Sequence, residues 1–186
     1  MYEMDKKILL IVGSLREKSF NREVARYVES KLNEKGLKVS FLDYANIPFL
    51  NQDIEFPTPE EIKEVREEVN AANALWVFSP EYNGSVPGVL KNLLDWISRP
   101  LDPASFGAPS ILLDKLVTVS SIAGGSKGSF VIPELKGLLG RMKLKVLDEF
   151  TGLQVPGEAW QTGVLVLSDE QKAELDKQVE AFVSKL

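Results

Sequence analysis

Lys7-Ile8-Leu9-Leu10-Ile11-Val12-Gly13-Ser14-Leu15-Arg16-Glu17-Lys18-Ser19-Phe20-Asn21 is the stretch that decides the fold. The run from Ile8 to Val12 is continuously apolar, which is typical of a strand buried on both faces. A polar loop follows from Ser14 to Phe20, and from Asn21 onward apolar residues recur at helical spacing. The stretch therefore predicts a strand, a loop and a helix.

The same unit recurs along the rest of the chain. The predicted strands are residues 7–12, 37–42, 74–78, 115–122, 145–147 and, near the end, 164–167. The predicted helices begin near Asn21, at Pro59, at Pro87, after the loop 124–128 and at Ser168. Alternating strands and helices favour a parallel sheet with helices on both faces, in a single domain over residues 1–186. In such sheets ligands bind at the carboxyl ends of the strands.

Composition excludes several classes of chemistry. The chain has no cysteine and no histidine, which excludes thiolate nucleophiles, Cys- or His-bound metals and a Ser-His-Asp triad. A net charge of −5 makes nucleic acid an unexpected partner. Apolar runs of about five residues are too short to span a membrane. The first residues do not resemble a signal peptide, so we expect a cytoplasmic protein.

The loop after the first strand offers a seat for an anion. It joins the amino terminus of a helix to the hydroxyls of Ser14 and Ser19, the amide of Asn21 and the guanidinium of Arg16. A simple helix cap with a solvated arginine is the alternative. The loop contains neither a Walker A element nor a dinucleotide-binding glycine motif, because Gly13 is its only glycine.

Two further loops follow buried strands. The first reads Ser79-Pro80-Glu81-Tyr82-Asn83-Gly84-Ser85-Val86-Pro87-Gly88, and the second reads Ser120-Ser121-Ile122-Ala123-Gly124-Gly125-Ser126-Lys127-Gly128. An aromatic ring and backbone amides in the first suit a flat heterocycle, although Asn-Gly also favours a plain tight turn. Glycines in the second allow a ligand to approach the backbone, or form a flexible connection. Together the three loops suggest a mononucleotide with a large ring, such as a flavin.

These motifs resemble the NAD(P)H-dependent FMN reductases, a family of flavodoxin-like fold that includes quinone, azo-dye and chromate reductases. The first loop is similar to the family pattern G-S-x-R-x-x-S-x-N. Residues 80–96 are similar to P-E-Y-N-x-S followed by L-K-N-x-x-D-W, the latter carried by Leu90-Lys91-Asn92 and Asp95-Trp96. The resemblance covers essentially the whole chain. It implies a three-layer α/β/α sandwich with a five-stranded parallel sheet of order 2-1-3-4-5.

The resemblance also implies the site residues. FMN phosphate would be bound by Ser14, Arg16, Ser19, Phe20 and Asn21. The isoalloxazine and ribityl chain would be lined by Pro80, Glu81, Tyr82, Asn83 and Gly84, with Ser121, Gly124 and Gly125 at the ring edge. No residue is expected to be catalytic and no metal is expected, because NADPH or NADH would pass a hydride to FMN, which would then reduce a small acceptor.

Two other functions remain open at this point. A flavodoxin-like electron carrier would bind FMN without turning over NAD(P)H, but its phosphate loop carries a glycine that residues 14–19 lack. A flavin-free scaffold would keep the fold alone. The family resemblance further implies a homodimer or homotetramer, with Phe49, Phe56, Trp96 and the stretch 43–57 as candidate contacts. The alternative is that these residues simply cover the edge of the sheet.

Overall fold

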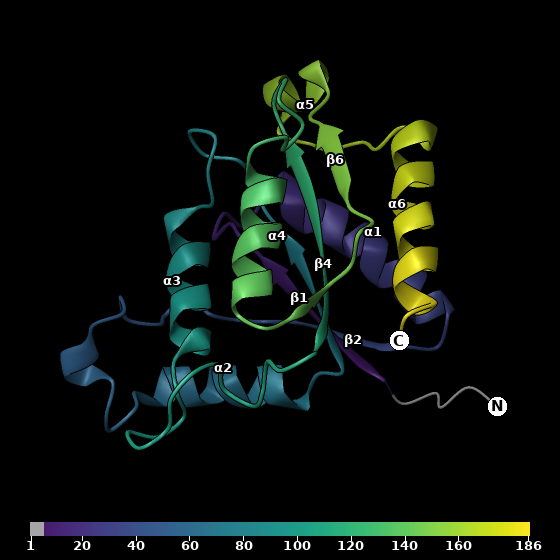
Figure 1. Ribbon diagram of the computed structural model, residues 1–186. Helices are drawn as coiled ribbons and strands as arrows, with labels where there is room; N and C mark the ends of the chain where they lie inside the picture. The colour runs from purple at the N-terminus through teal and green to yellow at the C-terminus, as the bar shows by residue number, and fades with distance from the viewer. Residues whose placement is uncertain (1–5) are drawn as a thin grey trace.

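A computed structural model describes residues 6–186 of the protein (Figure 1). The strands are β1 (Lys7–Val12), β2 (Lys38–Phe41), β3 (Ala74–Phe78), β4 (Leu116–Ala123), β5 (Lys145–Val146) and β6 (Thr151–Gln154). The helices are α1 (Phe20–Glu34), the 3-10 turn η1 (Gln52–Ile54), α2 (Glu60–Ala71), α3 (Gly88–Ser98), α4 (Val131–Arg141), α5 (Gly157–Thr162) and α6 (Asp169–Val183). Within this part of the chain no helix has the length and apolarity needed to cross a membrane.

The strands form one parallel sheet of order β2-β1-β3-β4-β5, which confirms the predicted order. The fifth position is filled by two short strands rather than one. β5 pairs with the start of β4 at Leu116 and Val117, and β6 pairs with its end, from Ser120 to Ala123. Between them the Thr118 hydroxyl donates to the Glu149 carbonyl at 2.9 Å, so a side chain replaces the ladder where the strand is interrupted.

Helices cover both faces of the sheet, as the apolar strands require. Leu9 and Ile11 belong to the core shared with α2, α3 and α4, whereas Ile8, Leu10 and Val12 belong to the core shared with α1 and α6. Every residue from Ile8 to Val12 is buried, because alternate side chains meet a helix layer on each side. This double burial explains why the strand has no polar alternation.

The tail differs from the prediction. Residues 164–167 were expected to form a strand, but they run as irregular chain between α5 and α6 and pair with no strand of the described residues. Val164 and Val166 are exposed, while Leu165 and Leu167 pack against the core. The apolar alternation therefore reflects a segment lying on the surface of the core, and the strand expected there lies earlier, at β6.

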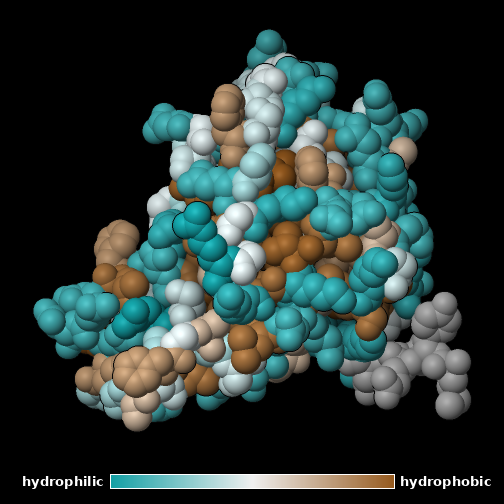
Figure 2. All heavy atoms as spheres, viewed as in Figure 1, coloured by the Kyte–Doolittle hydropathy of each residue, from teal (hydrophilic) through white to brown (hydrophobic). Residues whose placement is uncertain are grey.

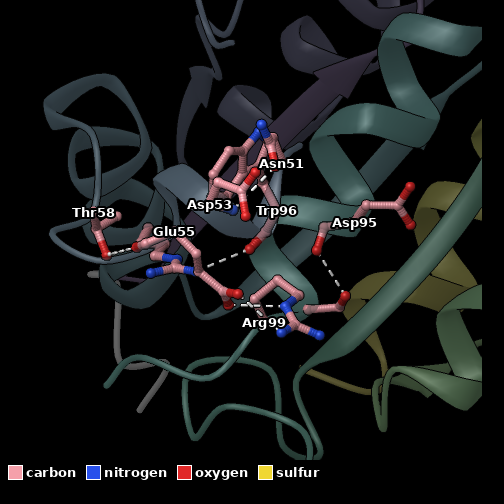
Figure 3. Close-up of polar contacts among 9 residues, drawn as sticks. Asn51, Asp53, Glu55, Thr58, Asp95, Trp96 and Arg99 are labelled. Atoms are coloured by element: carbon pink, nitrogen blue, oxygen red, sulfur yellow. Dashed lines mark hydrogen bonds and ion pairs between the residues drawn. The ribbon is translucent and has the colours of Figure 1, made fainter. Parts of the chain in front are cut away.

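The segment between β2 and α2, residues 42–59, runs along α3 and is tied to it by side chains. Asn92 donates to the Pro48 carbonyl at 2.9 Å and accepts from the Leu50 amide at 2.8 Å. The Trp96 indole also donates to Pro48, at 2.8 Å. Farther along, Figure 3 shows the Glu55 carboxylate facing the Arg99 guanidinium, with two contacts of 2.8 and 2.9 Å. The Asn and Trp of the sequence motif thus hold this segment in place.

Candidate functional site

The three loops identified from the sequence converge at one edge of the sheet. β1, β3 and β4 are neighbours and parallel, so the loops that leave their carboxyl ends lie side by side. The Gly13 amide donates to the Phe78 carbonyl at 2.7 Å, and the Ser79 amide donates to the Ser120 carbonyl at 3.0 Å. A Cβ on Gly13 would lie 2.9 Å from a terminal methyl of Leu90 and 3.3 Å from the Ser79 hydroxyl, so the first loop leaves the sheet in close contact with its neighbours.

The first loop leaves the amino terminus of α1 open. Ser19 is the N-cap residue and its carbonyl accepts from Arg22 and Glu23, but its hydroxyl makes no capping hydrogen bond. The first amides of a helix have no partner within the helix. The Ser14 hydroxyl is buried nearby and accepts from the Arg16 amide at 3.3 Å. The Ser19 side chain therefore does not cap this helix. The first backbone amides of α1 remain free to donate to an anion.

Asn21 lies at this helix end but its side chain is already engaged. Its amide nitrogen donates to the Ile122 carbonyl at 2.9 Å, and its oxygen accepts from the Ile122 amide at 3.1 Å. Both groups are buried. The side chain therefore joins α1 to the end of β4, which sets the spacing between the first and the third loop.

The loop after β3 forms the tight turn that Asn-Gly favours and still presents an aromatic ring. Tyr82 and Ser85 exchange two backbone hydrogen bonds, of 3.2 and 3.0 Å, and both central residues have positive φ, 53° at Asn83 and 70° at Gly84. The Tyr82 side chain is 49% exposed. The loop therefore forms a tight turn and still leaves the Tyr82 ring half exposed to solvent.

Two carboxylates join this loop to α4 in opposite directions. The Glu81 carboxylate accepts from the amides of Phe130 and Val131, both at 3.0 Å, and so caps a helix that has no cap of its own. In return, the Glu134 carboxylate accepts from the Ser85 hydroxyl at 2.9 Å and from the Val86 amide at 3.3 Å. The second loop and the amino terminus of α4 are therefore held together from both sides.

The charge of Glu81 is stabilised by these donors. Burial raises the pKa of its carboxyl, but hydrogen bonds from the Ser126 hydroxyl and the two helix amides outweigh burial and hold the pKa below its usual range. The carboxylate accordingly stays ionised at neutral pH and is occupied as a hydrogen-bond acceptor.

The third loop contains space and an unused donor. A Cβ on Gly124 or Gly125 would meet no atom within 4 Å, so the backbone there is open to a ligand. The Ser121 hydroxyl is buried and has no hydrogen-bond partner within residues 6–186. By contrast, a Cβ on Gly128, at φ 75°, would lie 2.5 Å from the Ser121 side chain. The open helix terminus, the unpaired serine and the open glycine backbone all fit FMN.

Sequence reasoning missed several residues of this edge. Glu134 and Phe130 belong to the contacts above, and Trp160 of α5 packs against Phe20. The sequence did offer a signal for Glu134, because it is an acidic residue in the first turn of α4, where a carboxylate is favoured. Trp96, expected at a subunit contact, is fully buried against the Pro48 carbonyl and is unavailable for one.

The chain is similar to known proteins over most of its length. The NADPH-dependent FMN reductase family matches residues 6–153. A quinone reductase of Pseudomonas putida is 34% identical over 182 residues, which cover 96% of this chain and 91% of the relative. A 2-hydroxy-1,4-benzoquinone reductase of a Burkholderia species is 39% identical over 104 residues, and this match spans about half, 56%, of each chain.

Solved structures of flavoproteins superpose on this chain. FerB of Paracoccus denitrificans, a flavoenzyme NAD(P)H:(acceptor) oxidoreductase, superposes with a TM-score of 0.80 at 26% identity over 96% of each chain. A Streptococcus pneumoniae flavodoxin, with a TM-score of 0.63 and 13% identity over 98% of this chain and 99% of its own, shares the fold alone. The chain belongs to the NADPH-dependent FMN reductase family and is an oxidoreductase of flavodoxin-like fold.

Proposed function

We propose that residues 1–186 act as one FMN-binding domain that uses NADPH or NADH to reduce a quinone. The observation that carries the cofactor assignment is the open amino terminus of α1, where the Ser19 hydroxyl is not used as a cap and Arg16 lies alongside. The quinone is proposed because the P. putida relative that matches nearly the whole chain is a quinone reductase. Free flavins, azo compounds and metal oxyanions are the other acceptors to be tested.

The first loop would hold the phosphate of FMN. Ser14, Ser19 and Arg16 would supply hydroxyl and guanidinium donors, and the amides at the start of α1 would add the favourable end of the helix dipole. Phe20 would support Arg16, because the guanidinium carbon lies 5.8 Å from its ring centroid. Asn21 would contribute by spacing the loops through Ile122.

The other two loops would receive the isoalloxazine ring. Pro80, Tyr82, Asn83 and Gly84 would line it from the turn after β3, with Ser121, Gly124 and Gly125 at its edge. Bound FMN would supply the redox chemistry, which is hydride transfer from NAD(P)H and electron transfer to the acceptor. The carboxylates of Glu81 and Glu134 accept hydrogen bonds from neighbouring groups, so the chain would orient the reactants rather than move protons.

Exposed aromatic residues support a homodimer or homotetramer. Phe49 is 81% exposed and Phe56 lies on the same segment. Figure 2 shows hydrophobic side chains reaching the surface at its lower left, where Figure 1 places the loop that follows α3. Burial of such side chains stabilises subunit contacts. The cytoplasm, where NAD(P)H is available, is the location that we propose.

The test is a visible spectrum of the protein incubated with FMN, desalted, and treated anaerobically with NADPH and separately with NADH. Retained flavin that bleaches rapidly, and is reoxidised by a benzoquinone, is the expected result. Flavin that is retained but not bleached would identify a carrier of the flavodoxin type. Absence of retained flavin, followed by a titration with no saturable binding, would refute the cofactor assignment.

A further inference from the structure

Helix α5 brings an aromatic residue to the phosphate end of the site. The helix follows β6 and lies beyond the carboxyl ends of β4 and β6 in Figure 1. It also lies outside residues 6–153, the part that matches the family. Its Trp160 side chain is 60% exposed, whereas Trp76 and Trp96 are fully buried. An exposed tryptophan on a short helix beside the cofactor loops calls for a physical explanation.

The position of Trp160 is set by its neighbours. Ala159 is buried in the core that α1 and α6 share, and so anchors α5 to it. The helix begins after Pro156 and ends at Gly163, which adopts the left-handed conformation. The Trp160 ring meets the Phe20 ring edge to face, with centroids 5.5 Å apart and planes at 78°. This is a favourable aromatic geometry.

Phe20 in turn contacts Arg16. The ring of Phe20 is buried, belongs to the same core and packs against the Trp160 ring. The Arg16 guanidinium carbon lies 5.8 Å from its centroid. Among residues 6–186 no carboxylate lies within 4.0 Å of that guanidinium to fix it otherwise. The Phe20 ring is therefore the group against which the Arg16 guanidinium is oriented.

We propose that Trp160 is a positioning residue for phosphate recognition: it holds the Phe20 ring, and the ring holds the Arg16 guanidinium toward the phosphate of FMN. This inference rests on the proposed function, because it takes FMN as the ligand. Trp160 acts through Phe20 and not by contact with the reacting atoms. Pre-ordering the guanidinium lowers the entropy lost when the phosphate binds.

A double-mutant cycle on the dissociation constant for FMN tests the proposal. The constant is measured from the quenching of FMN fluorescence, without turnover, for wild type, Trp160→Ala, Trp160→Phe, Arg16→Ala and the Arg16→Ala/Trp160→Ala variant. We expect Trp160→Ala to weaken binding by roughly threefold to tenfold, the scale of an aromatic pair. Trp160→Phe should bind FMN almost as tightly as wild type. The double variant should bind FMN no more weakly than Arg16→Ala alone.

A matched control is available on another face. Phe150 is also an exposed aromatic residue beside a cation, with Lys136 4.9 Å from its ring centroid, and Phe150→Ala should leave FMN binding unchanged. Additive losses in the cycle would overturn the proposal, as would a Trp160→Ala variant that binds like wild type. Failure of the proposed function looks different, because wild type itself would then show no saturable binding of FMN.

Discussion

Asn21 and Ile122 are joined by a pair of hydrogen bonds that fits a primary amide to a backbone unit, with distances of 2.9 and 3.1 Å. The two residues are 101 positions apart in the chain. Asn21 lies in the first turn of α1 and Ile122 near the end of β4, so this pair fixes the first loop relative to the third loop. The amide therefore contributes to the site through the fold.

Asn21→Ala should lower the free energy of unfolding by about 2–3 kcal/mol, because it leaves a buried backbone donor and acceptor at Ile122 unsatisfied. Urea unfolding followed by circular dichroism measures the change. Asn33→Ala, at an exposed position of the same helix, is the control and should stay within about 0.5 kcal/mol of wild type. Equal effects of the two substitutions would contradict the structural role of Asn21.

Arg16→Ala should weaken FMN binding by about 1.5–3 kcal/mol, the contribution of a hydrogen bond to a charged group. Fluorescence titration with FMN provides the measurement. Arg26→Ala, a substitution of an exposed arginine on the outer part of α1, removes the same charge at a distance from the loop and should have little effect. An unchanged affinity in Arg16→Ala would remove this residue from the phosphate site.

Glu81→Gln should lower the stability at pH 7 by roughly 0.5–1 kcal/mol, since a neutral amide caps α4 less well than a carboxylate and the position is partly exposed. The folded-state pKa of Glu81 is lowered, so its contribution is fully present above the ordinary pKa of 4.5. It is lost as the pH falls through the lowered pKa.

Urea unfolding of wild type and Glu81→Gln over a pH series below 7 checks this prediction. The difference between the two proteins should shrink as the pH falls below 4.5. Glu67→Gln, on the exposed face of α2, should show little difference at any of these pH values. A Glu81→Gln effect that is independent of pH would argue against the carboxylate cap.

Alanine substitutions at Gly124 in the third loop and at Gly152 in β6 should have different effects, the first on FMN binding and the second on stability. Gly124→Ala adds a Cβ into open space, so FMN affinity should fall while the unfolding free energy stays within about 0.5 kcal/mol. Gly152→Ala places its Cβ 2.3 Å from the Lys127 carbonyl, so it should lower stability by about 1–3 kcal/mol. Unfolding and FMN titration on both variants test this, and a stability loss in Gly124→Ala would show that its space is needed by the protein itself.

Arg99→Ala should lower stability by about 1–3 kcal/mol, because it deprives the buried Glu55 carboxylate of its two-pronged partner. This expected loss of stability is smaller than that for breaking a fully buried ion pair, because the Arg99 side chain is 34% exposed. Thermal or urea unfolding measures it. Lys91→Ala breaks the exposed Lys91–Asp95 pair on the same helix and should cost less than about 0.5 kcal/mol; comparable losses would contradict the buried role of Glu55.

Much of the fold could be predicted because burial leaves a mark on the sequence. The run from Ile8 to Val12 and the run from Ala74 to Phe78 are apolar at every position, and both are central strands. The final helix was predicted from Ser168, and the structure shows a complete capping box there with Gln171. These signals are local, so they do not depend on how the chain folds back on itself.

The errors arose where the same local pattern has two structural outcomes. Val164 and Val166 alternate with leucines like a strand, yet the segment crosses the surface of the core instead. The interruption between β5 and β6 lies beside Thr118 of β4, whose hydroxyl donates to the carbonyl of Glu149, a residue 31 positions away. Alternation reports which side chains are buried and says nothing of which strand, if any, lies alongside.

The sequence by itself determined the order of the main strands and helices from β1 to β5, the burial of the sheet on both faces and the positions of the three loops that leave the carboxyl ends of β1, β3 and β4, because spacing and hydropathy encode these features locally. Tertiary structure decided what each loop residue does: Asn21 binds Ile122, Glu81 caps α4, and Trp160 meets Phe20. These contacts join residues that are far apart in the chain. Their partners are set by the packing of the layers, which no local pattern of residues specifies.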